Sequence, residues 1–283
     1  MYSLFLELYE EFAKAGSADP LGETLHAADI LSAGALRKTG RSLLEEKGIS
    51  TGGIAALRQT GKPLEYILGM APFMGRLLHC APGALIPREE TELLAGTCIA
   101  AIKEMQREKR DITVIELGTG CGNIAVSIAL GTENVAVYAS DVSAEAVEVA
   151  RRNVELFGVG DRVSLFCGDL FAPMKGKGLE GAVDLVVCNP PYIPTSSLEK
   201  LASEIIDHEP VVALDAGAYG IDIFRRLVAD SPVFLRPGGV LAFEIGAGQD
   251  KLVARLFNKS GAYENIGNYD DGENIRVFSA VRK

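Results

Sequence analysis

The chain has 283 residues, of which 48% are hydrophobic, and a formal net charge of -10. This length allows one large domain or a medium domain with a smaller one, and the acidic charge disfavours a general nucleic-acid binder, whose affinity depends on phosphate contacts. The beginning lacks a basic leader, no apolar run spans a membrane, and the five cysteines and three histidines lack metal-site spacing, so we expect a cytoplasmic protein without metal.

The first segment is predicted to form a bundle of short helices. Leu4, Leu8 and Phe12 recur at helical spacing, and Asp19-Pro20 has the residue types of a helix start. We assign residues 1–71 to a helical N-terminal domain. Prolines bracket the next stretch, so residues 72–87 are predicted to form a β-hairpin linker.

The remaining segment, residues 88–283, is predicted to be an α/β domain. A helix over residues 89–104 is followed by alternating strands and helices, which indicate a mostly parallel sheet covered on both faces. The predicted strands cover residues 112–117, 135–140, 163–167, 183–188, 239–245 and 274–281. The predicted helices between them cover residues 121–130, 144–156 and 221–230.

A glycine-rich loop follows the first of these strands. It runs from Glu116 to Gly122 and precedes a helix, so its backbone amides can approach a ligand closely. Asp141 closes the next strand, where a carboxylate can accept hydrogen bonds from both ribose hydroxyls of an adenosine cofactor. Three alternatives stay open at this point: an ordinary strand-to-helix loop, Asp141 as a helix N-cap, and a dehydrogenase.

The segment Asn189-Pro190-Pro191-Tyr192 directly follows an apolar strand. The two prolines stop the strand and stiffen the backbone. A planar nitrogen with a delocalised lone pair is a poor nucleophile, and it reacts only when hydrogen-bond acceptors hold its N–H groups in the right orientation. The Asn189 side-chain oxygen and the Pro190 carbonyl supply such acceptors, and the Tyr192 ring can stack on the planar group. The alternative is a proline-rich turn with an incidental asparagine.

Together these features resemble the release-factor glutamine methyltransferases of HemK/PrmC type. The resemblance covers about residues 60 to 283. Besides the glycine loop and the Asn189 segment, it is carried by residues 61–69, 85–92, 169–171, 209–214, 220–222, 236–239 and 270–277. It implies a class I, Rossmann-like methyltransferase domain with a seven-stranded sheet. The family usually has Asp where Glu116 stands.

What the resemblance implies is methyl transfer from S-adenosylmethionine to the side-chain amide of a glutamine in the Gly-Gly-Gln loop of a peptide chain release factor. Asn189, Pro190 and Tyr192 would be catalytic, and Pro191 and Arg88 would join them in substrate binding. The N-terminal helices would grip the release factor, and we expect a monomer. The cofactor-binding residues it implies are Glu116, Gly118, Thr119, Gly120, Cys121, Gly122, Asp141, Asp169 and Leu170.

Other interpretations remain at this point. The Asn189 segment alone does not separate a glutamine amide from an adenine amino group, so a ribosomal-protein glutamine or nucleic-acid base N-methyltransferase is the alternative enzyme. The acidic charge and the helical N-terminal segment favour a protein substrate without stable nucleic-acid binding. The third interpretation is a non-enzymatic binding protein with a degenerate cofactor pocket, and the intact Gly118, Gly120, Asp141 and Asn189 argue against it. Arg88 and Glu92 either line the cleft or form an ion pair at a helix start.

Overall fold

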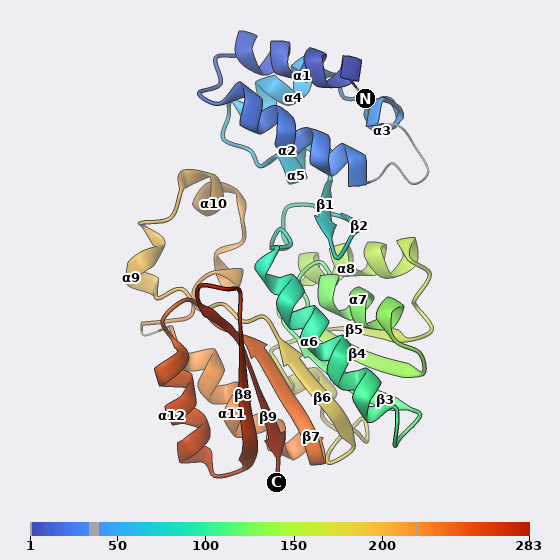
Figure 1. Cartoon of the computed structure of the whole chain (residues 1–283), viewed down its shortest axis with the longest axis vertical. Coiled ribbons are helices and arrows are strands. Elements are labelled where there is room, and N and C mark those ends of the chain that lie inside the picture. The colour runs from blue at the N-terminus through green and yellow to red at the C-terminus, as the bar shows by residue number, and fades with distance from the viewer. Residues whose placement is uncertain (1, 34–39, 219) are drawn as a thin grey trace.

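Figure 1 shows a computed structural model of the chain, which describes residues 2–33, 40–218 and 220–283. Short helices lie at one end of the molecule, a two-stranded hairpin follows them, and a unit with a seven-stranded sheet forms the rest. Residues 34–39, part of the predicted helical segment, lie outside the described residues. None of the described helices is long and apolar enough to cross a membrane.

The N-terminal helices bury an apolar core of their own. Leu8 and Phe12 lie one helical turn apart on α1 and pack with Ile30 of α2 and Ile54 of α4, all of them buried. The five helices are α1 (Tyr2–Lys14), α2 (Pro20–Ala33), α3 (Gly40–Lys47), α4 (Thr51–Arg58) and α5 (Leu64–Leu68). The short helices predicted in this segment are therefore present.

The predicted helix start at Asp19-Pro20 is confirmed. Helix α2 begins at Pro20, whose missing N–H is no loss in the first turn of a helix. The Asp19 carboxylate accepts a hydrogen bond from the Gly22 N–H (2.9 Å), which satisfies one of the free donors of that turn.

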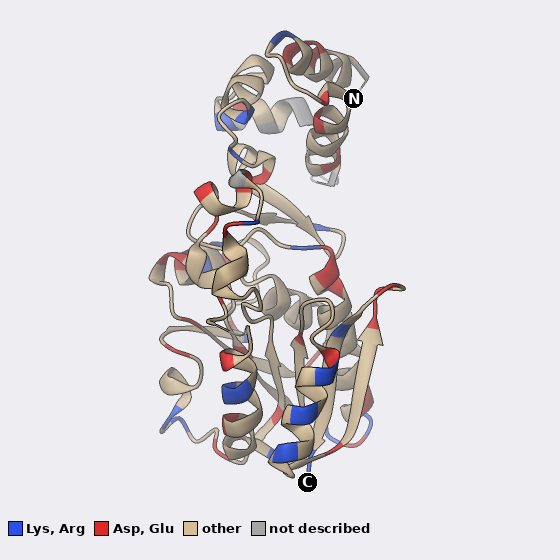
Figure 2. Cartoon of the chain, turned by 90° about the vertical axis from the view of Figure 1, so that its left-hand side faces the viewer, with Lys and Arg blue, Asp and Glu red and all other residues tan. Residues whose placement is uncertain are grey.

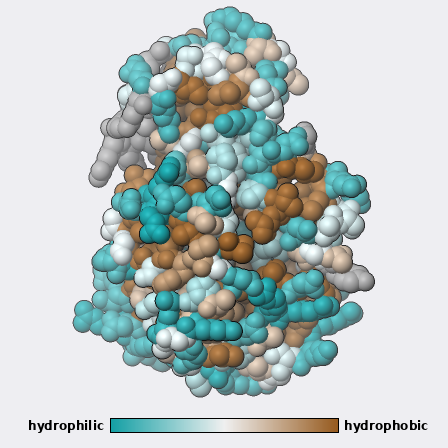
Figure 3. All heavy atoms as spheres, turned by 180° about the vertical axis from the view of Figure 1, so that it is seen from behind, coloured by the Kyte–Doolittle hydropathy of each residue, from teal (hydrophilic) through white to brown (hydrophobic). Residues whose placement is uncertain are grey.

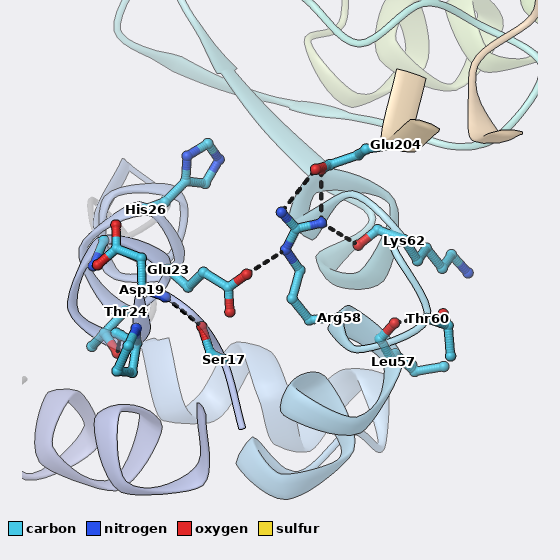
Figure 4. Close-up of polar contacts among 12 residues, drawn as sticks. Ser17, Asp19, Glu23, Thr24, His26, Leu57, Arg58, Thr60, Lys62 and Glu204 are labelled. Carbon is cyan, nitrogen blue, oxygen red and sulfur yellow. Dashed lines mark hydrogen bonds and ion pairs between the residues drawn. The ribbon is translucent and has the colours of Figure 1, made fainter. Parts of the chain in front are cut away.

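Arg58, at the end of α4, joins these helices to the sheet unit. Figure 4 shows its guanidinium between two carboxylates, Glu23 of α2 (2.9 Å) and Glu204 of α10 (Ser203–His208; 2.8 Å). It also donates to the Lys62 carbonyl (3.2 Å). The Arg58 side chain is only 18% exposed, so these contacts are less screened than ordinary surface ion pairs. They tie α2, α4 and α10 together.

A hairpin connects the two parts of the chain. Strand β1 (Met70–Phe73) pairs antiparallel with β2 (Arg76–His79). The hairpin begins two residues before the predicted start of the linker at residue 72. Met74 and Gly75 form the two-residue turn, both with positive φ, as tight hairpin turns require. The loop after β2 leads into α6 (Glu90–Met105), the helix predicted over residues 89–104.

The predicted seven-stranded, mostly parallel sheet is confirmed. Its strand order is β5-β4-β3-β6-β7-β9-β8, with the first five strands parallel and β9 antiparallel to both neighbours. The strands are β3 (Ile112–Leu117), β4 (Val135–Asp141), β5 (Val163–Cys167), β6 (Val183–Cys188), β7 (Leu235–Glu244), β8 (Tyr263–Asp270) and β9 (Ile275–Arg282).

Helices cover both faces of the sheet, which explains the unbroken apolar run in β6. Leu185 and Val187 pack on the face covered by α6, α7 (Asn123–Gly131) and α8 (Ala144–Leu156). Val186 and Cys188 point to the opposite face, where α11 (Asp222–Phe234) and α12 (Asp250–Ser260) pack. A central parallel strand has no solvent face, so polar alternation is lost.

Several elements differ from the sequence prediction: β7 begins at Leu235 and not at residue 239, and helices α9 (Thr195–Leu198) and α10 were not predicted. Helix α11 continues past residue 230 to Phe234 although it contains Pro232. Proline has no N–H to donate to the Val228 carbonyl. That carbonyl accepts a hydrogen bond from the Tyr263 hydroxyl instead (3.1 Å). Strand β8 was missed because most of its side chains are exposed and its pattern is weak. Helix α12 was also missed, although it is amphipathic, with Phe257 buried and basic residues outward (Figure 2).

Asp184 of β6 is a buried charge on which the sheet depends. Its carboxylate is fully buried and accepts hydrogen bonds from Lys109 (2.8 Å), the Thr113 N–H (2.8 Å) and Arg236 (2.5 Å). Burial alone would raise its pKa, but the hydrogen bonds from Arg236 and Lys109 outweigh burial and hold the pKa below its ordinary value. One side chain thus links β6 to β3, to the segment between α6 and β3, and to the start of β7.

We expect Asp184→Asn to lower the free energy of unfolding at neutral pH by about 3 kcal/mol. This is the lower end of the range for a broken buried pair, because Lys109 and Arg236 are partly exposed and can regain water. Urea denaturation measures it, with the exposed Asp111→Asn as control. Because the folded-state pKa is depressed, the stabilisation is present above the unfolded pKa of about 4 and is lost as pH falls through the folded value. A difference between variant and wild type that grows in acid would contradict this assignment.

Candidate active site

A cavity lies at the carboxyl ends of β3, β4 and β6. Open parallel sheets bind ligands at this edge, where the loops after neighbouring strands meet. Most of the predicted site residues line it, although they come from positions far apart in the sequence. These are Arg88, Gly118, Thr119, Gly120, Cys121, Asp141, Asp169, Leu170, Asn189, Pro190 and Pro191. Glu116, Gly122 and Tyr192 are not among the lining residues.

The glycine loop owes its shape to three left-handed residues. Gly118, Gly120 and Gly122 have φ of 68°, 55° and 81°, a region that other residues enter only with strain. A Cβ at Gly120 would meet no atom within 4 Å, so that backbone faces open space. A Cβ at Gly122 would lie 3.2 Å from the Ala150 Cβ of α8. Gly122 therefore allows helix α8 to pack closely rather than lining the cavity.

Glu116 lies beneath the loop. Its carboxylate is buried, and Oε2 accepts a hydrogen bond from the Thr119 hydroxyl (2.7 Å), which ties the loop to the end of β3. Burial raises the Glu116 pKa to about 8, against the lowering effect of the Thr119 hydrogen bond. Its Oε1 has no hydrogen-bond partner among the described residues. The side chain supports the loop from below and does not reach the cavity wall.

Asp141, at the end of β4, lines the cavity, and each of its carboxylate oxygens accepts one backbone hydrogen bond. Oδ2 accepts from the Gly120 N–H (2.8 Å) and Oδ1 from the Ser143 N–H (2.9 Å). Each carboxylate oxygen keeps a second acceptor position for a ligand. Burial raises the Asp141 pKa, while these backbone hydrogen bonds lower it. Ser143, not Asp141, caps helix α8 by accepting from the Ala146 N–H (3.1 Å), so the N-cap alternative for Asp141 is excluded.

The loop after β5 forms another wall of the cavity. Leu170 has a positive φ of 43°, and its carbonyl accepts from the Ser140 hydroxyl (2.9 Å), which holds this residue against β4. Asp169 pairs with Arg226 of α11 (2.6 Å). Val142 and Ile223 also line the cavity and were not predicted. Val142 is a large apolar residue left half-exposed directly after the strand-ending acid, a position that could have signalled an apolar slot.

The Asn189-Pro190-Pro191-Tyr192 segment separates this cavity from a second one. Asn189, Pro190 and Pro191 line both, whereas Tyr192 lines only the second. The other residues around the second cavity are Leu85, Arg88, Ile193, Leu201, Ile205, Ala213 and Leu214. Seen from behind, hydrophobic side chains gather near the middle of the molecule, below the N-terminal helices (Figure 3). The segment is thus a shared wall that a group in either cavity can touch.

The predicted alternatives for Arg88 both describe part of its role. Arg88 lines both cavities and also forms an ion pair, but with Glu209 (2.5 Å) rather than with Glu92. The Glu209 side chain is 2% exposed and also accepts from the Ile86 N–H (3.2 Å). Glu92 instead accepts from the Met74 N–H (2.5 Å) at the hairpin turn. The pairing of Arg88 with Glu209 was not foreseen, because the two residues lie 121 positions apart in the sequence.

Comparison with known proteins identifies similar methyltransferases. The family model "Methyltransferase small domain" matches residues 96–218. The release factor glutamine methyltransferase of Moorella thermoacetica is 40% identical over 74% of this chain and 70% of its own length. The protein of the same name from Bacillus cereus is 32% identical over 90% of this chain and 89% of its own.

A solved structure supports the fold. The N-terminal domain of human METTL16, determined in complex with SAH, has a TM-score of 0.52 to this chain and covers 82% of each chain. Its sequence is only 17% identical, so the likeness concerns the fold alone. It agrees with a class I methyltransferase architecture in the sheet unit.

Two glycine substitutions separate the roles of the loop residues. Gly120→Ala introduces only the strain of a left-handed alanine, about 1–2 kcal/mol, because its Cβ points into open space. Gly122→Ala adds a close contact with Ala150, so we expect a further loss of about 1–3 kcal/mol. Urea denaturation of both variants measures the difference in the free energy of unfolding. Equal losses in the two variants would show that Gly122 has no packing role.

Proposed function

The chain belongs to the release factor glutamine methyltransferase family, and from this premise we propose that it methylates the side-chain amide nitrogen of a glutamine in a peptide chain release factor. The methyl donor would be S-adenosylmethionine, and the glutamine that of the Gly-Gly-Gln loop. The observation that carries the proposal is the shared wall: the Asn189 segment faces one cavity suited to the cofactor and a second one suited to a side chain.

The first cavity has the chemical features that an adenosine cofactor requires. Asp141 would accept hydrogen bonds from the ribose hydroxyls with its remaining acceptor positions, and Val142 and Leu170 would flank the adenine. Asp169 would lie beside the adenine, and the backbone from Gly118 to Cys121 would hold the amino-acid part. When bound, the cofactor supplies an electrophilic methyl group on its sulfonium.

The second cavity would take the glutamine side chain. The Asn189 side-chain oxygen and the Pro190 carbonyl would accept hydrogen bonds from its amide N–H groups and turn the nitrogen toward the first cavity. Proline supplies no competing N–H at this edge. The Tyr192 ring, on the wall of this cavity, would cover one face of the planar amide. Arg88 would contribute to the mouth shared by the two cavities.

The N-terminal helices would dock the rest of the release factor. We assign residues 1–71 to docking, 72–87 to the linker and 88–283 to catalysis, supported by the separate core of helices α1 to α5. Leu21, Leu25 and Leu57 on α2 and α4 are large apolar side chains that remain exposed and would suit a protein partner. A monomer would suffice, since all the proposed site residues lie in one chain. A release factor substrate would place the enzyme in the cytoplasm.

The direct test is to incubate the protein with a purified release factor and labelled S-adenosylmethionine. Mass spectrometry should locate one added methyl group on the glutamine of the Gly-Gly-Gln loop. Asn189→Ala should reduce this transfer by more than ~100-fold while cofactor binding persists, because oriented acceptors supply much of the rate. Label in a ribosomal protein, RNA or DNA, with none in the release factor, would favour the alternative substrates.

Asp141→Ala tests the proposed cofactor site separately. It should weaken S-adenosylmethionine binding by about 1–3 kcal/mol, the cost of losing hydrogen bonds to a charged group. Isothermal calorimetry measures the affinity, and Asp169→Ala is an informative comparison, because the Asp169 carboxylate is already paired with Arg226 and should matter less. An unchanged affinity in Asp141→Ala would remove this residue from the site.

A further inference from the structure

The Asn189 side chain is held by two residues for which no role was predicted. Its Nδ2 donates a hydrogen bond to the Thr91 hydroxyl (2.9 Å), and that hydroxyl donates to Oε2 of Glu244 (2.7 Å). Thr91 and Glu244 are each only 1% exposed. The three residues lie at the end of β6, the start of α6 and the end of β7. They form a buried chain of hydrogen bonds, here called the Asn189–Thr91–Glu244 relay.

The carboxylate at the far end sets the direction of every bond in this relay. An ionised carboxylate only accepts hydrogen bonds, so the Thr91 hydroxyl must give its single proton to Glu244. The Thr91 oxygen can then only accept, so Asn189 must present its NH₂ group to it. With the NH₂ group on Thr91, the Asn189 Oδ1 is the atom of this amide that can accept a hydrogen bond from a ligand.

Glu244 also contacts a cation and the other end of the Asn189 segment. Burial raises the pKa of Glu244, and the Thr91 hydrogen bond, Arg276 and the Tyr192 hydroxyl offset only part of this rise. The Arg276 guanidinium lies 3.8 Å from Oε1, on the side away from Thr91. Glu244 therefore contacts the support of Asn189 through one oxygen and a cation through the other.

We propose that Thr91 and Glu244 are positioning residues, which fix the Asn189 side-chain amide so that its oxygen faces the nitrogen to be methylated. The proposal rests on the proposed function, in which Asn189 must accept a hydrogen bond from an amide N–H. If the Asn189 side-chain amide were turned over, its NH₂ group would face the NH₂ group of the substrate glutamine. The substrate nitrogen would then lose its hydrogen-bond acceptor. The two prolines place the Asn189 backbone, and the relay places its side chain.

Thr91→Val is the first test, because it keeps the shape of the side chain and removes the hydroxyl. We expect kcat for release factor methylation to fall about tenfold, the value of one oriented hydrogen bond in the transition state. Thr91 also lines the first cavity, but its hydroxyl is bonded to Asn189 and Glu244 and valine keeps the shape of the wall, so the KM for the release factor and the S-adenosylmethionine affinity should change little. Thr91→Ser, which keeps the hydroxyl, should retain most of the activity. Circular dichroism and calorimetric cofactor binding establish that each variant is folded.

Glu244→Gln tests the direction of the relay. Arg276 favours the glutamine carbonyl oxygen on its own side, which presents the glutamine NH₂ to Thr91 and reverses each hydrogen bond up to Asn189. The expected loss in kcat is at least as large as in Thr91→Val. If Glu244→Gln does not fold, the comparison of Thr91→Val with Thr91→Ser tests the positioning role.

The Asn189→Ala background separates positioning from general packing. A residue that acts only through the Asn189 side chain cannot matter once that side chain is absent, so Thr91→Val should cause no further loss there. The proposal is overturned if Thr91→Val matches the wild type in kcat, if its cofactor affinity falls with kcat, or if it lowers Asn189→Ala by the same factor. Absence of methylation by the unsubstituted enzyme would instead contradict the proposed function.

Discussion

The site depends on one constraint, the common direction of five neighbouring strands. Because β5, β4, β3, β6 and β7 run parallel, the loops after them all open on the same edge of the sheet. Four parts of the site each follow a different strand: the glycine loop, Asp141, the Leu170 turn and the Asn189 segment. They are far apart in the sequence but meet at this edge of the sheet. The loop between β2 and α6 lines the cavity at this edge and contributes Arg88.

Buried carboxylates show how the structure handles charge at both ends of the strands: Asp184 lies near the amino end of β6, and Glu116 and Glu209 lie near the cavity at the carboxyl ends. Asp184 and Glu209 have cationic partners and anchor strands and loops. Glu116 has only the Thr119 hydroxyl, and its pKa is raised to about 8. Removing a carboxylate charge from water is costly unless hydrogen bonds and cations replace the lost solvation, so Asp184 and Glu209 fix the position of the groups that solvate them. The loops are therefore held by polar contacts beneath them and not only by packing.

Much of the fold could be predicted because it depends on local patterns. The runs of β-branched residues located β3 and β6, the Asp19-Pro20 pair located a helix start, and glycine spacing located the loop. Strand β8 gave no such pattern, because an exposed edge strand needs no apolar face. The end of α11 was missed because the Tyr263 hydroxyl, distant in sequence, satisfies the carbonyl that Pro232 leaves free.

The candidate site could be predicted only where one residue type implies one chemistry. Asn189 and Asp141 both line the first cavity, and their roles there stay predictions. Gly122, whose glycine reflects the close approach of α8, does not line it, and neither does Glu116, which lies under the loop. Thr91 and Glu244 are ordinary residues whose importance comes from a hydrogen bond across 153 positions.

The outer wall of the second cavity depends on two arginines from different parts of the chain. Ile205 of α10 lines that cavity, and the segment carrying it is held at both ends. Glu204 pairs with Arg58 of the N-terminal helices, and Glu209 pairs with Arg88 of the loop before α6. Any movement of the N-terminal helices relative to the sheet must therefore move α10 or break the Arg58 contact. A partner that docks on those helices would thus act directly on the wall of the cavity that its own side chain is proposed to enter.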